Sequence, residues 1–495
     1  MSTSDKSIDE PTADALRHLG VVGFTLAFLV VLTYIVPAFH RFRPWQSGDP
    51  WPLSSLATPA EELYAFAGSG NSGEAAEVDQ EALSANLGDA VASSLSAEPV
   101  PEGPRIEVLP SEYQGIEIHL EDASGEGMRP FYESLLQTAE GGTELTRIAH
   151  YGDSSIATDH ITYTLRRRLQ QRFGDGGHGF VLVARGYLPY RHRDIQHSAS
   201  DSWMLREITR NHLTSNGHYG FGGIQFRGRP GAWARFGTDD RGPVGGAVSR
   251  FEIYYQRHPR GGHIHYRVDQ DERTTIETRD PTPSDEIHRI DVPDGPHRLE
   301  VRFGGHGQPR IYGVVLEREG PGVVYDSLGL VGARASRLLN YDADHIRTQL
   351  ESRGSNLVIL GFGGNDANDN IQRDRYEAEY REVIQRMRAG REELGCLVFA
   401  PLDQGEQDQR GRVQTMSTIP TIVEAQRAAA AAEGCAFFDT WQAMGGDGAV
   451  RRWLQSRPRL ASSDMRHMTP SGYEVVANLF YKALLEGFAR YLEDR

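Results

Sequence analysis

The spacing of hydrophobic residues changes twice along this chain of 495 residues, and these changes restrict the fold more than any other feature. Residues 145–173 begin with the apolar run "LTRIAHYG" and continue with apolar residues every fourth position, which predicts a strand followed by a helix. Between about residues 201 and 317, apolar and polar residues alternate between Gly- and Pro-rich turns, as in antiparallel strands. After Val323, short apolar runs alternate with helical segments again. We therefore expect an α/β fold with a parallel sheet, interrupted by an all-β sandwich.

The segment Gly20–Phe39 carries no charged residue and, at 1.5 Å per helical residue, is long enough to cross a hydrocarbon core of ~30 Å. We interpret it as a transmembrane helix, with a cleaved signal peptide as the alternative. The following residues are rich in Ser, Ala, Gly, Pro and acidic side chains and lack the periodicity of a folded segment. The predicted organisation is a tail (1–19), a transmembrane anchor (20–39), a disordered acidic linker (40–105), the first part of the α/β domain (106–200), the β-sandwich (201–317) and the second part of the α/β domain (318–495).

The formal net charge of −16 argues against a nucleic-acid partner, because phosphate binding requires a basic face. Much of this charge lies between Pro44 and Pro104, where ten acidic residues occur without a Lys or Arg. One basic cluster follows the first predicted strand of the α/β domain, and we expect it to form a solvated helix face; it consists of Arg166, Arg167, Arg168 and Arg172.

Two cysteines, Cys396 and Cys435, are too few for a disulfide framework and lie in no zinc-binding pattern. The favoured interpretation is that both are small buried strand residues, with a bridge between them as the alternative. His263 and His265 share one face of a predicted strand, but no third ligand follows at a diagnostic spacing. We predict neither a metal ion nor a cofactor.

Three polar loops follow apolar runs or precede the last helix of the α/β pattern: "GDS" at residues 152–154, "GFGGND" at 361–366, and "SSDMRHMTPSGY" at 462–473. In an open parallel sheet, ligands bind at the carboxyl ends of the strands. We therefore expect these loops to converge on one site.

The residue types in these loops suit acyl transfer through a serine nucleophile. The Ser154 hydroxyl needs an imidazole base, for which His467 is the candidate, and Asp464 lies three residues earlier, where it can orient the ring. Negative charge on the attacked carbonyl requires fixed donors. The candidates for this oxyanion hole are the backbone N–H groups of Ser154 and Gly332 and the side-chain amide of Asn365.

These motifs resemble those of the SGNH/GDSL hydrolases over about residues 145–200 and 320–495. The resemblance implies a flavodoxin-like, three-layer SGNH domain. "GDS" matches the first block, G-x-N-D at 363–366 the third, and D-x-x-H at 464–467 the fifth. The second block, "LGLVGA", offers Gly332, with Gly329 as a rival, and has Val331 where Asn is expected.

Longer segments around "HYGDSSIATDH" and "YDSLGLVGARAS" are similar to bacterial peptidoglycan O-acetylesterases, whose SGNH domain is interrupted by a β-sandwich resembling a carbohydrate-binding module. The chain departs from that group at Ser155, where His is expected, and at "APLDQGE", where a Pro-Pro-Asp run is expected. These departures bear on which substrate the protein would accept more than on the type of reaction it would catalyse.

Together with the predicted transmembrane helix, the resemblance implies a membrane-anchored serine esterase that removes acetyl or short acyl groups from a cell-envelope polysaccharide such as peptidoglycan. Such an enzyme would be a single-pass membrane protein with its catalytic domain in the periplasm or outside the cell. A polysaccharide O-acetyltransferase with the same triad and a non-catalytic wall-binding protein remain alternatives.

Overall fold

A computed structural model describes residue 87 and residues 89–95, 105–187, 189–209, 214, 216–391 and 393–495. All of them belong to one compact unit, Glu74–Arg495. The transmembrane segment predicted at residues 20–39 lies outside the described residues and stays a prediction. Among the helices that the structure does describe, none combines the length and apolar character needed to cross a membrane.

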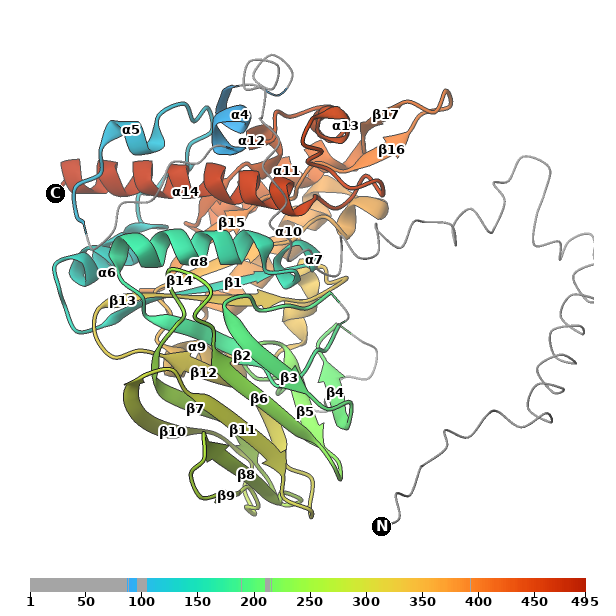
Figure 1. Ribbon diagram of the computed structural model, residues 1–495. Coiled ribbons are helices and arrows are strands. Elements are labelled where there is room, and N and C mark those ends of the chain that lie inside the picture. The colour runs from blue at the N-terminus through green and yellow to red at the C-terminus, as the bar shows by residue number, and fades with distance from the viewer. Residues whose placement is uncertain are drawn as a thin grey trace, which may run out of the picture. The chain divides into compact units, whose positions relative to one another are not determined.

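A five-stranded parallel sheet forms the centre of the α/β part (Figure 1). The strands lie in the order β13-β1-β14-β15-β18, so in chain order they are arranged 2-1-3-4-5, which is the doubly wound, flavodoxin-like arrangement. The order reverses between β1 and β14, and this switch point is where such sheets bind ligands. The bounds are β1 Leu145–Gly152, β13 Gly322–Gly329, β14 Leu357–Gly361, β15 Gly395–Phe399 and β18 Ala436–Phe438.

Helices cover both faces of this sheet because side chains alternate along each strand. Ile148 of β1 packs with α6, α8 and α14 in one hydrophobic core. Its neighbours Ala149 and Tyr151 belong to a second core, which includes α9, α10, α11 and much of the β-sandwich. The helix bounds are α6 Arg129–Ala139, α8 His160–Phe173, α9 Ala343–Arg353, α10 Arg373–Arg388, α11 Thr418–Ala432 and α14 Pro470–Glu493. Shorter elements connect them: α5 Pro110–Tyr113, α7 Ser154–Ala157, η2 Ala335–Asn340, η3 Asp366–Asn368, β16 Gly405–Gln407, β17 Val413–Thr415, α12 Thr440–Ala443 and α13 Ala449–Gln455.

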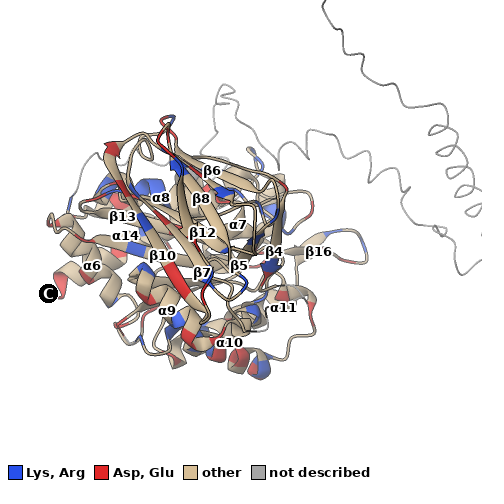
Figure 2. Cartoon of the chain, turned by 90° about the horizontal axis from the view of Figure 1, so that it is seen from below, with Lys and Arg blue, Asp and Glu red and all other residues tan. Residues whose placement is uncertain are grey.

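Two antiparallel sheets lie between β1 and β13 in the sequence. One has the order β10-β7-β12-β5-β4 with β2 added to β12, and the other has the order β3-β6-β11-β8-β9. Acidic and basic residues are interspersed over their strands and over α9 and α10 (Figure 2). The bounds are β2 Gly177–Leu182, β3 Ile195–Ala199, β4 Trp203–Glu207, β5 Ile224–Gly228, β6 Trp233–Thr238, β7 Val248–Arg257, β8 His263–Val268, β9 Thr274–Glu277, β10 Ser284–Gly295, β11 Arg298–Phe303 and β12 Arg310–Glu317.

The antiparallel sheets begin earlier in the chain than the predicted boundary at residue 201. Residues 177–182 of β2 pair with β12, and residues 195–199 of β3 pair with β6. In sequence, the polar turns beside these strands resemble the loops of an α/β domain. Only the pairing of the strands with distant segments assigns them to the antiparallel sheets.

The predicted disordered linker also needs a correction, because residues 89–95 form the helix α4. Val91 and Ala92 are buried in the same core as α14, and Asn478 of α14 donates a hydrogen bond from Nδ2 to the backbone oxygen of Ser94 at 2.7 Å. The few apolar residues of this otherwise polar segment are enough to dock it on the last helix.

The prediction of a solvated arginine face is wrong for Arg166 and Arg172, whose side chains are 1% and 0% exposed. Arg166 pairs with the buried carboxylate of Asp159 at 2.9 Å, and Arg172 pairs with Glu112 of α5. Burial of a guanidinium requires such partners, and the one on α5 is 60 residues away in the sequence.

Cys396 and Cys435 are both buried, as expected, but they are bridged, so the alternative interpretation is the correct one. Cys396 lies in β15, and Cys435 directly precedes β18, which is the parallel neighbour of β15. The pairing of these two strands brings the Cα atoms to 4.8 Å, which is within the range of a disulfide.

Candidate active site

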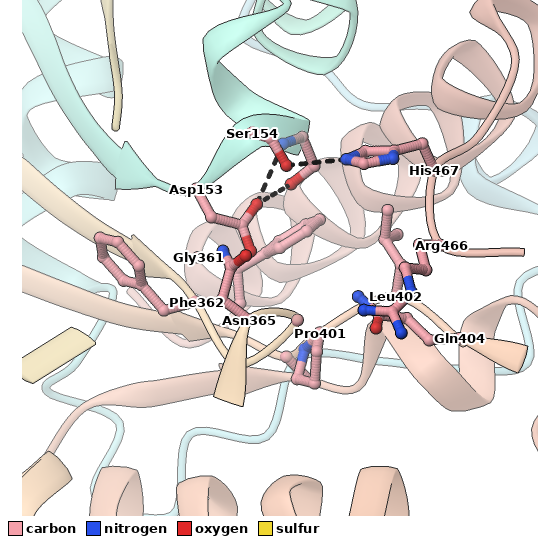
Figure 3. Close-up of a pocket in the computed structure, with 14 residues that line it drawn as sticks. Asp153, Ser154, Gly361, Phe362, Asn365, Pro401, Leu402, Gln404, Arg466 and His467 are labelled. Atoms are coloured by element: carbon pink, nitrogen blue, oxygen red, sulfur yellow. Dashed lines mark hydrogen bonds between the residues drawn. The ribbon is translucent and has the colours of Figure 1, made fainter. Parts of the chain in front are cut away.

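The three predicted loops do converge, at the carboxyl edge of the sheet where the strand order reverses. Ser154 is the first residue of α7, separated from the end of β1 by one residue, and Asn365 follows β14. His467 lies just before α14. All three line one pocket, and their side chains are shown in Figure 3.

Ser154, His467 and Asp464 form a continuous hydrogen-bonded chain. Ser154 Oγ lies 3.0 Å from His467 Nε2 (Figure 3). On the other side of the ring, His467 Nδ1 lies 2.6 Å from Asp464 Oδ2. With the ring proton on Nδ1 donated to Asp464, Nε2 is free to accept the serine proton. The arrangement therefore matches the predicted nucleophile, base and orienting carboxylate in geometry.

The turn that carries Asp464 fixes the carboxylate from its other side. Asp464 Oδ1 accepts hydrogen bonds from the backbone N–H groups of Arg466 and His467, both at 3.0 Å. Met465 between them has a φ of 60°, which a side-chain-bearing residue adopts rarely. The backbone N–H of Ser462 donates to the carbonyl of His467 at 2.8 Å and closes the turn.

The electrostatics of the pair follow from this geometry. Burial alone would raise the pKa of Asp464, but hydrogen bonds from the His467 ring and from two backbone amides lower the pKa to about 2. The hydrogen bond to Asp464 raises the pKa of His467 above 6.5, against the opposing effect of burial. The nearby Arg466 guanidinium lowers the pKa of His467, and Asp153 raises it.

Asp153, the middle residue of "GDS", positions the start of α7. Its carboxylate accepts hydrogen bonds from the backbone N–H of Ser155 at 3.0 Å and from the Ser155 hydroxyl at 2.8 Å. Burial raises the pKa of Asp153, and the Ser155 hydrogen bonds counter this rise. Ser155, which stands where the resembling enzymes have His, therefore supports the turn that presents Ser154.

Besides Ser154, the candidate oxyanion donors come from two loops that contact each other. Asn365 lines the pocket, and its Nδ2 donates to the carbonyl of Ala333 at 3.0 Å. Gly332 directly precedes Ala333, is exposed, and has a φ of 76°, which favours glycine. The rival Gly329 is buried at the end of β13, where a Cβ would lie 2.1 Å from the backbone nitrogen of Ala157. Gly329 thus has a packing reason to be glycine.

Several pocket residues were not predicted as part of the site. Gln404 is 8% exposed, and its Oε1 has no hydrogen-bond partner within the described part of the chain. Gln404 belongs to the segment "APLDQGE", which follows the apolar run of β15. Its position after the carboxyl end of a predicted strand, like that of "GDS", could have indicated that it belongs to the site. Arg466 lines the same pocket from the D-x-x-H turn (Figure 3).

Asp366, the last residue of G-x-N-D, is 3% exposed behind the pocket. Burial raises the pKa of Asp366 to about 7; the positive charge of Arg334 opposes this rise and the negative charge of Asp153 adds to it. Its Oδ2 is without a hydrogen-bond partner among the residues described. At neutral pH this carboxyl is therefore only partly ionised.

Part of the chain is similar in sequence to a known protein family. Residues 294–475 match the model of the GDSL-like Lipase/Acylhydrolase family. The match covers Gly332, Asn365, Asp464 and His467, whereas Ser154 lies upstream of the β-sandwich and outside the matched residues. No curated protein matches the chain in sequence.

The chain is also similar to solved structures. A peptidoglycan O-acetylesterase aligns with a TM-score of 0.61 and 23% sequence identity, over 75% of this chain and 99% of that one. A family two carbohydrate esterase from Cellvibrio japonicus aligns with a TM-score of 0.19 and 12% identity, over 48% of this chain and 85% of that one. A family 35 carbohydrate-binding module from Clostridium thermocellum aligns with a TM-score of 0.18 and 10% identity, over 25% of this chain and 98% of that one. The chain thus resembles the GDSL-like lipase/acylhydrolase family in sequence over residues 294–475 and a peptidoglycan O-acetylesterase in fold.

Proposed function

We propose that this protein is a serine esterase that removes acetyl groups from a cell-envelope polysaccharide, with peptidoglycan as the first candidate. The observation that carries the chemistry is the chain of hydrogen bonds from Ser154 Oγ through His467 to Asp464. The fold shared with a peptidoglycan O-acetylesterase supports the choice of substrate.

In this mechanism Ser154 Oγ attacks the acetyl carbonyl while His467 Nε2 takes its proton. The Asn365 amide and the backbone N–H groups of Ser154 and Gly332 would stabilise the oxyanion. His467 then protonates the sugar oxygen as the C–O bond breaks, which leaves an acetyl ester on Ser154. A water molecule, deprotonated by the same imidazole, hydrolyses that ester and releases acetate.

The location of the enzyme is part of the proposal. We propose that residues 20–39 anchor the chain in a membrane and that the catalytic part lies on the oxidising side, in the periplasm or outside the cell. The disulfide between Cys396 and Cys435 supports this placement, because disulfides persist in oxidising compartments and are rare in the cytosol. Accessibility of the intact protein on whole cells to an added protease would test the orientation.

The reaction is tested with the full chain, because α4 packs against α14 and truncation to residue 106 would remove part of the core. Acetate release is measured from p-nitrophenyl acetate and from O-acetylated peptidoglycan. Ser154→Ala should lower both rates by roughly 10³-fold or more. Ser463→Ala removes an exposed hydroxyl from the loop that carries Asp464 and should leave both rates unchanged.

The outcomes separate the reaction from the substrate. Hydrolysis of p-nitrophenyl acetate without release of acetate from the polymer would support the proposed esterase activity and reject peptidoglycan as its substrate. Acetylated sugar formed when an oligosaccharide acceptor is added would identify a transferase that uses the same triad. Binding to insoluble peptidoglycan without turnover of either ester would reject the enzyme and favour a wall-binding protein.

A further inference from the structure

Two histidines and a glutamate meet on the β-sandwich, at the end of the sheet where β8 and β9 lie, away from the helices (Figure 1). His263 begins β8 and Glu277 ends β9, and the antiparallel register places them directly opposite each other. His306 lies in the turn after β11, which is the neighbour of β8 on its other side. One ligand atom from each of the three residues lies within 4.8 Å of the other two.

The three side chains already contact one another. His263 Nε2 and Glu277 Oε2 are 2.8 Å apart. The ring centroids of His263 and His306 are 4.1 Å apart, with an interplanar angle of 81°. The side chains of His263 and Glu277 are 34% and 50% exposed, so an ion can reach them from solvent.

The backbone around this cluster fixes the position of His306. The backbone N–H of Gly304 donates to the carbonyl of His263 at 2.8 Å. A Cβ at Gly304 would lie 2.4 Å from the Cβ of His263, and a Cβ at Gly262 would lie 2.0 Å from the carbonyl oxygen of His306. These glycines allow the two segments to approach closely, which keeps the two imidazoles adjacent without a bound ligand.

We propose that His263, Glu277 and His306 form a binding site for a divalent transition-metal ion of the zinc class. Two imidazole nitrogens and one carboxylate suit Zn²⁺, Cu²⁺ or Ni²⁺, whereas Mg²⁺ and Ca²⁺ prefer oxygen ligands. A common ion would require each of the three donors to lie about 2 Å from it.

The fourth position of a tetrahedral ion is assigned to water. His265 lies on the same face of β8, but its ring centroid is 6.2 Å from that of His263, and its Nδ1 is 2.9 Å from Thr275 Oγ1. The other group of three candidate ligands among the described residues, His218, Asp285 and His345, is less suited. His345 Nε2 there accepts from the backbone N–H of Gly220 at 2.8 Å, and its Nδ1 lies 2.6 Å from Asp285 Oδ2.

A bound ion would connect β8, β9 and the turn after β11, and so stabilise this end of the sandwich rather than take part in ester hydrolysis. A ligand that binds only the folded state raises its stability. The site is independent of the proposed function, and its test uses the metal itself as the probe.

The full chain, purified without a polyhistidine tag, is titrated with ZnCl₂ by calorimetry, with MgCl₂ as the reference ion. Thermal unfolding is followed with and without zinc. We expect one site that binds Zn²⁺ and not Mg²⁺, and a zinc-dependent rise in Tm. His306→Ala should weaken zinc binding by roughly tenfold or more and remove the rise in Tm. Glu277→Gln should do the same and provides a second variant.

The matched control is His297→Ala, because His297 also pairs with a carboxylate on the same sheet, Asp269 at 2.7 Å, but is outside the cluster. It should bind zinc as the wild type does. Zinc binding that is unchanged in His306→Ala and Glu277→Gln, or no zinc binding by the wild type, would overturn the proposal. Hydrolysis of p-nitrophenyl acetate, measured in parallel, should be the same for His306→Ala and the wild type.

Discussion

Asp464 Oδ2 lies 2.6 Å from His467 Nδ1, and this hydrogen bond is the largest cause that raises the pKa of His467 above 6.5. The proposed reaction needs neutral His467, so kcat/KM should rise with pH through a midpoint above pH 6.5. The pH profile of the full chain on p-nitrophenyl acetate measures this midpoint. A midpoint below 6.5 would contradict the assigned base.

The variant Asp464→Asn tests the role of Asp464 through the same pH profile of kcat/KM. It removes the cause that raises the pKa of His467, so the midpoint should move to lower pH, and loss of the ring's orientation should reduce kcat by roughly 10³- to 10⁴-fold. Asp344→Asn, at a side chain that is 88% exposed, should change neither quantity.

Arg466→Gln should move the midpoint in the opposite direction. The Arg466 guanidinium lowers the pKa of His467, so its removal should raise that pKa and shift the profile to higher pH. The shift should shrink in high salt, because Arg466 is exposed and ions screen its charge. An identical profile for Arg466→Gln and the exposed control Arg459→Gln would show that Arg466 does not act on His467.

Asp366→Asn should stabilise the protein at alkaline pH more than at acidic pH. Burial raises the pKa of Asp366 from 3.8 to about 7, so the stability that the protonated form provides is complete below pH 3.8 and is lost as pH rises through 7. Asparagine has the shape of the protonated acid and cannot ionise. Urea unfolding at pH 5 and pH 8 measures the effect, and an equal change at both pH values would contradict the raised pKa.

Glu317→Gln should destabilise the junction of the sandwich with the parallel sheet by about 3–5 kcal/mol, since it removes one of the carboxylates that pair with the buried Arg353. Glu317 is 0% exposed and pairs with Arg147 of β1 at 2.9 Å and with Arg353 of α9.

Burial would raise the pKa of Glu317, but Arg353 and Arg147 lower it below 4.5. Its contribution is therefore present above pH 4.5 and is lost as pH falls. Urea midpoints of the variant and of Glu319→Gln, whose side chain is 69% exposed, should differ at pH 7 and converge in acid.

Cys396→Ser should lower the free energy of unfolding by about 3–4 kcal/mol, because the bridge closes a loop across a sequence separation of 39 residues. The same loss should follow when the wild type is unfolded under reducing conditions. Cys435→Ser provides the matching variant, and the double replacement should cost no more than either single one. Urea unfolding with and without a reductant tests all of these, and a wild type insensitive to the reductant would contradict the prediction.

The three residues of the hydrogen-bonded chain were predictable because each belongs to a short motif. "GDS" and D-x-x-H place Ser154, Asp464 and His467 at strand ends or before a helix, and parallel-sheet geometry then requires their loops to meet. The doubly wound order of the sheet was implied by the resemblance to SGNH hydrolases and agrees with the observed arrangement.

The features that were missed depend on contacts distant in sequence. Arg172 resembles a solvated residue until Glu112 is seen beside it, and the Cys396–Cys435 bridge depends on which strands are neighbours. The closeness of His306 to His263 has no local signal, because His306 lies in the turn after β11 and His263 begins β8. Hydrophobic periodicity and short motifs give information only about residues that are close in the sequence. The pairings above are set by the tertiary fold.

The insertion of the β-sandwich between β1 and β13 has a consequence for folding. The two strands are paired from Leu145↔Gly322 to Gly152↔Gly329, so their pairing closes a loop that holds the whole sandwich. Contacts of such separation form slowly unless the intervening chain is already compact. During vectorial synthesis the sandwich is complete before β13 emerges, whereas His467 emerges 313 residues after Ser154. We therefore expect the sandwich to fold first and to bring β1 and β13 together, and Ser154, His467 and Asp464 to come together last. Partially synthesised chains should then lack the proposed esterase activity.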